Sequence, residues 1–183
     1  MNFIEHSDLV GTHAFLSPSQ NAWTNYTNEK LEQRYLAAKA VERGTRLHEF
    51  AAEAIRLNRK QSGRDTLSLY VNDAIGLKMK PEQPLFYSFN CYGTADAIAY
   101  RRNVLRIHDL KTGKTPAHFE QLELYAALFC LKYLMKPDKI KMELRLYQAN
   151  EVQVLTPEPD DIFKMMDAIR KADTWVNEMK AKG

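Results

Sequence analysis

Hydrophobic and polar positions alternate along two short segments near the middle of the chain, Thr94–Arg101 and Val104–Lys111. A two-residue period is typical of a strand that buries one face. Arg102 and Asn103 separate the segments, and asparagine tolerates the positive φ that a two-residue hairpin turn requires. The pattern therefore predicts an antiparallel hairpin.

The register of this hairpin brings two carboxylates together. With a two-residue turn, Arg101 pairs with Val104, and Asp96 lies opposite Asp109, with Lys111 one diagonal step away. Opposed like charges repel, and burying an unpaired charge is costly. We therefore expect a hard divalent cation between the carboxylates, with Lys111 at the rim. The alternative is an exposed hairpin in which Asp109 and Lys111 form a surface ion pair. The other positions of the face are apolar: Ile98, Tyr100, Leu105 and Ile107.

The remaining pattern predicts helices around a sheet. After an irregular lead-in over Met1–Leu16, helices are expected over Asn21–Tyr26, Asn28–Asn58 (one helix, or two with a break at Gly44), Thr66–Met79, Ala117–Leu134 and Pro159–Met179. Pro81 to Pro84 should end the third of these. Further strands are expected over Leu85–Tyr92, Lys139–Gln148 and Glu151–Leu155. This order predicts an α/β fold, a central mixed sheet flanked by helices.

Length and composition agree with one globular domain over residues 1–183. The chain has 183 residues, 45% hydrophobic and 27% charged. Within it we expect a helical N-terminal part (1–60), the sheet with a core helix (85–155) and a C-terminal helix (159–180). The net charge of +3 fits a polyanionic partner without requiring one. Neither a signal peptide nor a membrane-spanning run is recognisable, so a cytoplasmic location is expected.

Other side chains could complete a site near the hairpin. Gln121 and Tyr125 are four residues apart and share a helical face. They could hold the lysine or a phosphate, or simply pack in the core and cap a backbone group. His48 stands on a close-packing helical face, where it is either a satisfied core residue or a metal ligand. Glu82, just before the first predicted strand, is a further acidic candidate.

Four motifs occur in a fixed order: Gly44-Thr-Arg-Leu-His48, Gly93-Thr-Ala-Asp-Ala-Ile98, Ile107-His-Asp-Leu-Lys-Thr-Gly113 and Gln121-Leu-Glu-Leu-Tyr125. Together they resemble the RecB-like branch of the PD-(D/E)XK nuclease superfamily, metal-dependent DNA nucleases with a restriction-endonuclease-like core. The resemblance implies that His48, Asp96 and Asp109 bind one or two Mg²⁺ or Mn²⁺ ions, with Glu82 as an additional ligand. It also implies that Lys111 is the catalytic lysine and that Gln121 and Tyr125 support it.

The chain departs from some members of that branch. CRISPR-associated relatives carry four cysteines for an iron–sulfur cluster, whereas this chain has only Cys91 and Cys130, so no such cluster is expected. A helicase portion, as in RecB, is not expected either. A stand-alone exonuclease of a phage or mobile element, acting in the cytoplasm of a bacterial host, fits these departures.

DNA is the partner that the resemblance implies. Basic residues could hold its backbone phosphates, although each could equally be an ordinary surface charge: Arg43, Arg46, Arg56, Lys60, Arg101, Arg102 and Lys114. Trp23, Tyr26 and Tyr92 could stack on unpaired bases or pack in the core. A homo-oligomer or a recombination partner protein stays open, because no motif specifies either.

The expected function is hydrolysis of phosphodiester bonds at DNA ends by a metal-dependent exonuclease that acts in DNA recombination and repair. Two alternatives stay open. One is a structure- or sequence-specific DNA endonuclease, and the other is a non-catalytic nucleic-acid-binding protein that retains the fold.

Overall fold

The computed structural model describes Ser7 and residues 12–182, so most of the predicted lead-in lies outside the described residues. Contacts divide the chain into two compact units, Met1–Arg43 and Gly44–Gly183. The expectation of a single domain therefore remains a prediction.

The N-terminal unit contains a short 3₁₀ helix, η2 (Pro18–Asn25), followed by the first part of helix α1 (Asn28–Arg56). Pro18 is the first residue of η2, a position that suits proline, and the preceding Ser17 makes no side-chain capping hydrogen bond. Helix α1 continues through Gly44 without a break, because its sequence is rich in good helix formers on both sides of the glycine.

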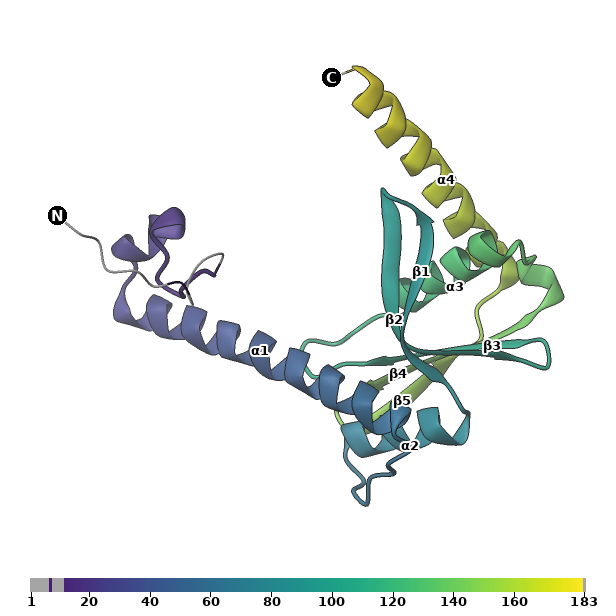
Figure 1. Ribbon diagram of the computed structural model, residues 1–183, viewed down its shortest axis with the longest axis horizontal. Helices are drawn as coiled ribbons and strands as arrows, with labels where there is room; N and C mark the ends of the chain where they lie inside the picture. Colours follow the sequence, from purple (N-terminus) through teal and green to yellow (C-terminus); the bar gives the residue numbers. More distant parts are fainter. Residues whose placement is uncertain (1–6, 8–11, 183) are drawn as a thin grey trace. The chain divides into compact units, whose positions relative to one another are not determined.

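The larger unit contains a mixed sheet, which in the described residues has five strands in the order β1-β2-β3-β4-β5. The strands are β1 (Lys80–Ser88), β2 (Cys91–Arg101), β3 (Val104–Leu110), β4 (Lys141–Gln148) and β5 (Glu151–Leu155). Strands β3 and β4 run parallel, and the other neighbouring pairs are antiparallel. Figure 1 shows β1 and β2 continuing as a hairpin away from the other strands.

Helices cover both faces of this sheet, which confirms the predicted α/β fold class. One core packs α3 (Glu120–Tyr133) and α4 (Pro159–Lys182) against the sheet. The other core packs the end of α1 and helix α2 (Thr66–Gly76) against the opposite face. A short 3₁₀ helix, η3 (Pro137–Lys139), leads into β4.

The hairpin of β2 and β3 has the predicted register. Arg101 pairs with Val104, and the pairing runs on to Ala97 and His108. Arg102 and Asn103 both have positive φ, 51° and 62°, as a two-residue turn of this kind requires.

Several predicted boundaries were wrong. Strand β1 begins at Lys80 rather than Leu85, because an edge strand accommodates prolines such as Pro81 and Pro84 that a central strand would exclude. Helix α2 ends at Gly76 instead of Met79, and α3 begins at Glu120 instead of Ala117. Helix α4 extends to Lys182. Among the described residues, none of the helices has the length and apolar character needed to cross a membrane.

Candidate metal centre

The site lies where strand β2 separates from strand β3. Their pairing ends at Ala97 and His108, one residue short of the predicted Asp96–Asp109 pair. Beyond that point, Oδ2 of Asp96 accepts a hydrogen bond of 2.9 Å from the backbone N–H of Leu110. The Asp96 carboxylate thus replaces a backbone acceptor of the ladder, which fixes its position beside the end of β3.

Glu82 lies on β1, directly across from Asp96 on β2. Pro81 pairs with Ala97 and Gln83 with Ala95, so the intervening residues face each other. Glu82 has a φ of 49°, a left-handed conformation that is uncommon for a residue other than glycine. Strained backbone of this kind is concentrated at functional sites. The sequence placed Glu82 before the first strand, whereas it lies inside β1.

His48 reaches the same point from helix α1. Its Nδ1 lies 3.3 Å from Oδ2 of Asp96. One ligand atom each of His48, Glu82 and Asp96 lie within 4.8 Å of one another. Two carboxylate oxygens and an imidazole nitrogen suit Mg²⁺ or, better, Mn²⁺, so these residues fit the ion that the motifs imply.

Hydrogen bonding, burial and neighbouring charge shift the pKa values of His48 and Glu82. The hydrogen bond to Asp96 raises the pKa of His48 above its ordinary value, and this outweighs burial, which lowers it. Burial and then the charge of Asp96 raise the pKa of Glu82. His48 and Glu82 also line a hollow of about 490 Å³, which Glu49, Glu53 and Arg56 help to enclose.

Asp109 and Lys111 form a second, adjoining group. Asp109 is only 2% exposed, so the alternative of a surface ion pair was wrong. Lys111 Nζ lies 3.2 Å from Oδ1 and 3.0 Å from Oδ2, but only Oδ1 accepts a hydrogen bond. Oδ2 is therefore a buried oxygen without a hydrogen-bond partner in the described part of the chain. Burial and then Asp96 raise the pKa of Asp109, while Lys111 acts in the opposite direction.

Helix α3 holds the lysine from the other side. Nζ of Lys111 donates to Oε1 of Gln121 at 2.7 Å, and Nε2 of Gln121 donates to the Tyr125 hydroxyl at 3.2 Å. Gln121 thus contacts the ammonium rather than capping a backbone group. Burial raises the pKa of Tyr125, so its hydroxyl stays protonated.

Two motif glycines permit close approach between the motifs. A Cβ at Gly93 would lie 2.9 Å from Cε1 of Tyr125, and a Cβ at Gly44 would lie 3.0 Å from Oγ1 of Thr112. Each glycine therefore allows its own segment to pack against another motif.

A partly buried polar network that links α2, β3 and β4 was not predicted. The Tyr147 hydroxyl donates to Oδ2 of Asp73 at 2.8 Å and lies 3.2 Å from Nδ1 of His108. Arg145 donates to the same carboxylate oxygen. Burial, followed by the charges of Arg145 and Arg106, lowers the pKa of His108 to about 3. No sequence signal links α2 to β4, since these partners are more than seventy positions apart.

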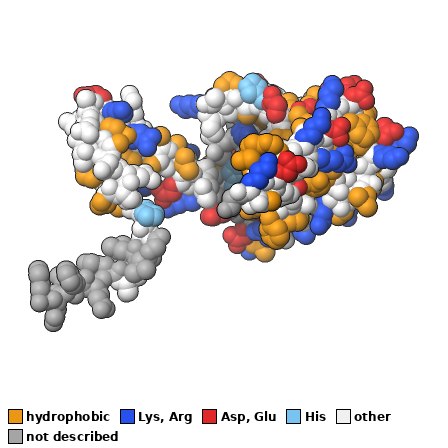
Figure 2. Space-filling view, turned by 90° about the horizontal axis from the view of Figure 1, so that it is seen from above, with side chains coloured by type: hydrophobic (Ala, Val, Ile, Leu, Met, Phe, Trp, Pro, Cys, Tyr) orange, Lys and Arg blue, Asp and Glu red, His pale blue; other side chains and the backbone are white. Residues whose placement is uncertain are grey.

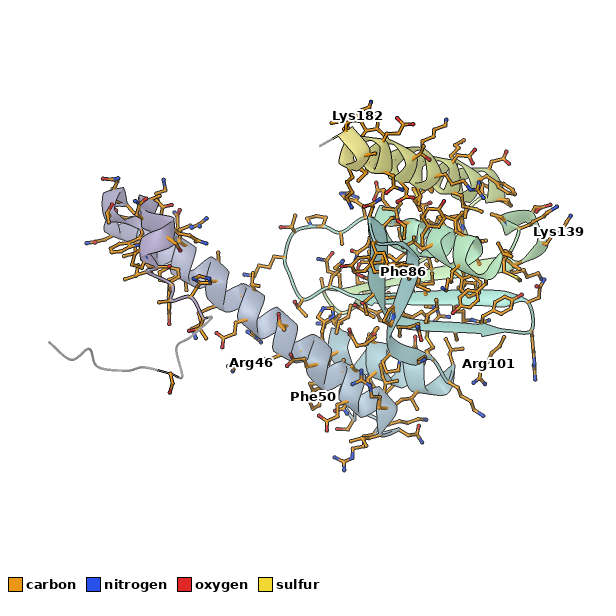
Figure 3. The ribbon with its side chains drawn as sticks, turned by 45° about the horizontal axis from the view of Figure 1, so that its top comes forward. Arg46, Phe50, Phe86, Arg101, Lys139 and Lys182 are labelled. Carbon is orange, nitrogen blue, oxygen red and sulfur yellow. The ribbon has the colours of Figure 1, made fainter. Side chains whose placement is uncertain are left out.

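The basic residues predicted to bind DNA lie in several parts of the chain, and one of them, Arg56, lines the hollow beside His48 and Glu82. Arg102 stands at the β2–β3 turn, six strand positions from Asp96, or about 20 Å. Figure 3 labels its neighbour Arg101 in the same region. Arg46, Lys60 and Lys114 are exposed, and Arg43, also exposed, ends the N-terminal unit. The face in Figure 2 shows charges of both signs among hydrophobic side chains.

The three aromatic residues considered for base stacking differ in exposure. Trp23 and Tyr26 of the N-terminal unit are partly buried, and Trp23 donates to the carbonyl oxygen of Ser17. Tyr92 is 67% exposed, so the expectation that it packs in the core was wrong.

Comparison of the chain with protein-family models, with curated proteins and with solved structures gave no significant match. The fold and the residues described above therefore define the molecule as an α/β protein with a candidate metal centre at the edge of a mixed sheet.

Proposed function

We propose that this chain is a metal-dependent DNA nuclease that hydrolyses phosphodiester bonds at DNA ends. The observation that carries the proposal is the convergence of His48, Glu82 and Asp96, whose ligand atoms lie within 4.8 Å of one another. Asp109 and Lys111 adjoin this group. The Lys111 ammonium supplies positive charge, which a phosphodiesterase needs to offset its anionic substrate.

Each residue has a role that follows from its surroundings. Asp96 and Glu82 supply carboxylate oxygens and His48 supplies a neutral imidazole nitrogen. Asp109 adjoins them, and its Oδ2 accepts no hydrogen bond in the described part of the chain but lies 3.0 Å from the Lys111 ammonium. A magnesium or manganese ion held there would polarise the scissile phosphodiester and favour deprotonation of water.

Lys111 is positioned to act on the reacting atoms. An ammonium has three N–H donors, and two of them are directed at Asp109 and Gln121. The third is left for a water molecule or a phosphate oxygen. Tyr125 holds Gln121, and Gln121 holds the ammonium, so the pair fixes the direction of that third donor.

The resemblance to the RecB-like PD-(D/E)XK nucleases supports the choice of DNA as substrate. Residues from all four motifs adjoin one another through the Asp96–His48, Lys111–Gln121 and Gly93–Tyr125 contacts. The same resemblance, rather than any contact in the structure, favours DNA ends over internal sites.

The substitution Lys111→Ala tests the catalytic role. We expect it to lower the rate of Mn²⁺-dependent degradation of linear DNA by about 10²- to 10³-fold, the usual effect of losing a charge-stabilising donor. Lys139→Ala is the matched control, because Lys139 is an exposed lysine paired with Asp138. Circular dichroism checks that both variants are folded. Full activity of folded Lys111→Ala would contradict the assignment.

Substrate form separates the proposal from its alternatives. With 5′- and 3′-labelled linear DNA, we expect loss of label that depends on Mn²⁺ and stops with EDTA. Covalently closed circular DNA should stay intact, whereas its cleavage would favour an endonuclease. Binding of DNA without any metal-dependent cleavage would favour a non-catalytic binding protein.

A further inference from the structure

Three aromatic side chains gather at the end of the β1–β2 hairpin, and we call them the aromatic tip: Phe86, Phe89 and Tyr92. Phe89 is 89% exposed and Tyr92 is 67% exposed. The ring centroids of Phe86 and Phe89 are 5.3 Å apart, and those of Phe86 and Tyr92 are 6.2 Å apart in a stacked arrangement. Exposed rings gain little from folding, and a cluster of them on the surface is typical of a binding site.

Helix α4 holds this tip in place. Asp173 accepts hydrogen bonds from the side chains of Ser88 and Asn90, and Asn177 accepts a further one of 2.8 Å from Asn90. The Lys180 ammonium donates to the Asn90 side chain. Figure 1 shows α4 running alongside the end of the hairpin. The rings are therefore presented by an anchored turn, which lowers the entropic cost of binding to them.

The tip shares one side of the hairpin with the candidate metal centre. Successive residues of a strand point to opposite faces, so Tyr92, Thr94 and Asp96 share one face of β2. The intervening Gly93 contacts Tyr125 of α3, on the other face. Four strand positions separate Tyr92 from Asp96, which is about 13 Å. Thr94 and its pairing partner Pro84 are exposed, so the path between tip and site is open.

The chemistry of the tip matches unpaired nucleobases. Planar rings stack on the face of any base, and a nearby cation can meet the adjoining phosphate. Lys132 Nζ lies 5.6 Å from the centroid of the Phe86 ring. Bases inside a duplex are already stacked and paired, so only a single strand offers free faces along its length.

We propose that the aromatic tip stacks the bases of single-stranded DNA and leads the strand along this face of the hairpin to the metal centre. This inference rests on the proposed function and adds the substrate class, a single-stranded end. Phe89 and Tyr92 are the primary contacts, and Lys132 holds a phosphate.

Binding measured in EDTA tests the inference without catalysis. The probe is a fluorescein-labelled oligo-dT of about ten nucleotides, followed by fluorescence anisotropy. Tyr92→Ala and Phe89→Ala should each raise Kd by about five- to 100-fold, the range that corresponds to one lost base–aromatic stack. Tyr92→Phe should bind the oligonucleotide with the affinity of the wild type, since it keeps the aromatic ring. Trp175→Ala is the matched control: Trp175 is 61% exposed on α4 and two positions from Asp173, away from the tip.

The outcomes separate this inference from the nuclease proposal. Wild-type affinity for the oligonucleotide in both alanine variants, or no binding by the wild type, would overturn the inference and leave the tip to a protein partner. Metal-dependent cleavage of blunt duplex would still support the nuclease proposal in that case. Weakened binding in the variants without metal-dependent cleavage of any DNA would instead overturn the nuclease proposal.

Discussion

Asp96 is the residue on which the site depends, because it contacts both the backbone and the other ionisable groups. Its Oδ2 accepts from Leu110 N–H and lies 3.3 Å from His48 Nδ1. Its charge also raises the pKa of Glu82 and of Asp109, in each case after burial. Keeping these neighbouring carboxylates ionised is unfavourable without a cation. A divalent ion would relieve that repulsion and stabilise the folded state.

The pH dependence of metal binding follows from His48. Its pKa is raised above the ordinary value of 6.5, chiefly by the hydrogen bond to Asp96. Below that raised pKa the imidazole is protonated and cannot act as a ligand, so affinity is full at higher pH and falls as pH decreases. We expect the Kd for Mn²⁺, measured by isothermal titration calorimetry, to increase about tenfold between pH 7.5 and pH 5.5.

Two variants control this measurement. His48→Gln should bind Mn²⁺ more weakly at pH 7.5 and show a smaller pH dependence. His118→Gln removes an exposed histidine and should behave as the wild type. Equal Kd values for the wild type at both pH values would contradict a ligand role for His48.

At the scale of elements, the local pattern predicts which segments form strands better than it predicts where each strand begins and where two strands stop pairing. The β2–β3 hairpin follows from alternation and a two-residue turn, and its register is the predicted one. The start of β1 could not be predicted, because only its place at the sheet edge makes Pro81 and Pro84 tolerable. The point at which β2 leaves β3 depends on the contact between Asp96 and Leu110, which no local pattern encodes.

The site was predicted only in part for the same reason. Asp96, Asp109 and Lys111 follow from the hairpin, whereas the helical faces of His48 and Gln121 left a core role open and only the order of the motifs implied their place in the site. The place of Glu82 opposite Asp96 depends on the β1–β2 register, which requires the true start of β1. Contacts between residues far apart in the sequence, such as Asp73 and Tyr147, could not be predicted from the spacing of residues along the chain.

The contact between β2 and α3 predicts the effect of a glycine substitution. Gly93→Ala would place a Cβ 2.9 Å from the Tyr125 ring and force the ring aside. We expect a loss of about 1–3 kcal/mol in the free energy of unfolding, measured with urea, and reduced nuclease activity, because Tyr125 supports Gln121 and Lys111. Gly76→Ala is the matched control, since a Cβ there meets nothing within 4 Å. It should not lower stability. Equal urea midpoints for the two variants would contradict the close-packing role of Gly93.

At the scale of the whole molecule, the site of the larger unit draws on both faces of the sheet. His48 comes from α1, which packs with α2 on one face, while Gln121 and Tyr125 come from α3 on the other. Both groups lie near the point where the pairing of β2 with β3 ends, at Ala97 and His108. Beyond this point, β1 and β2 continue as a hairpin away from the other strands, and its end carries the aromatic tip (Figure 1). One structural feature thus supports both the metal centre and the proposed strand path.

Anomalous diffraction from crystals soaked in Mn²⁺ tests the central claim most directly. The account predicts one or two anomalous peaks, with at least one within about 2.5 Å of oxygens of Glu82 and Asp96 and a nitrogen of His48. The peak should be absent from crystals of Asp96→Asn. An occupied Mn²⁺ site elsewhere in the chain, with no peak among these three side chains, would contradict the account.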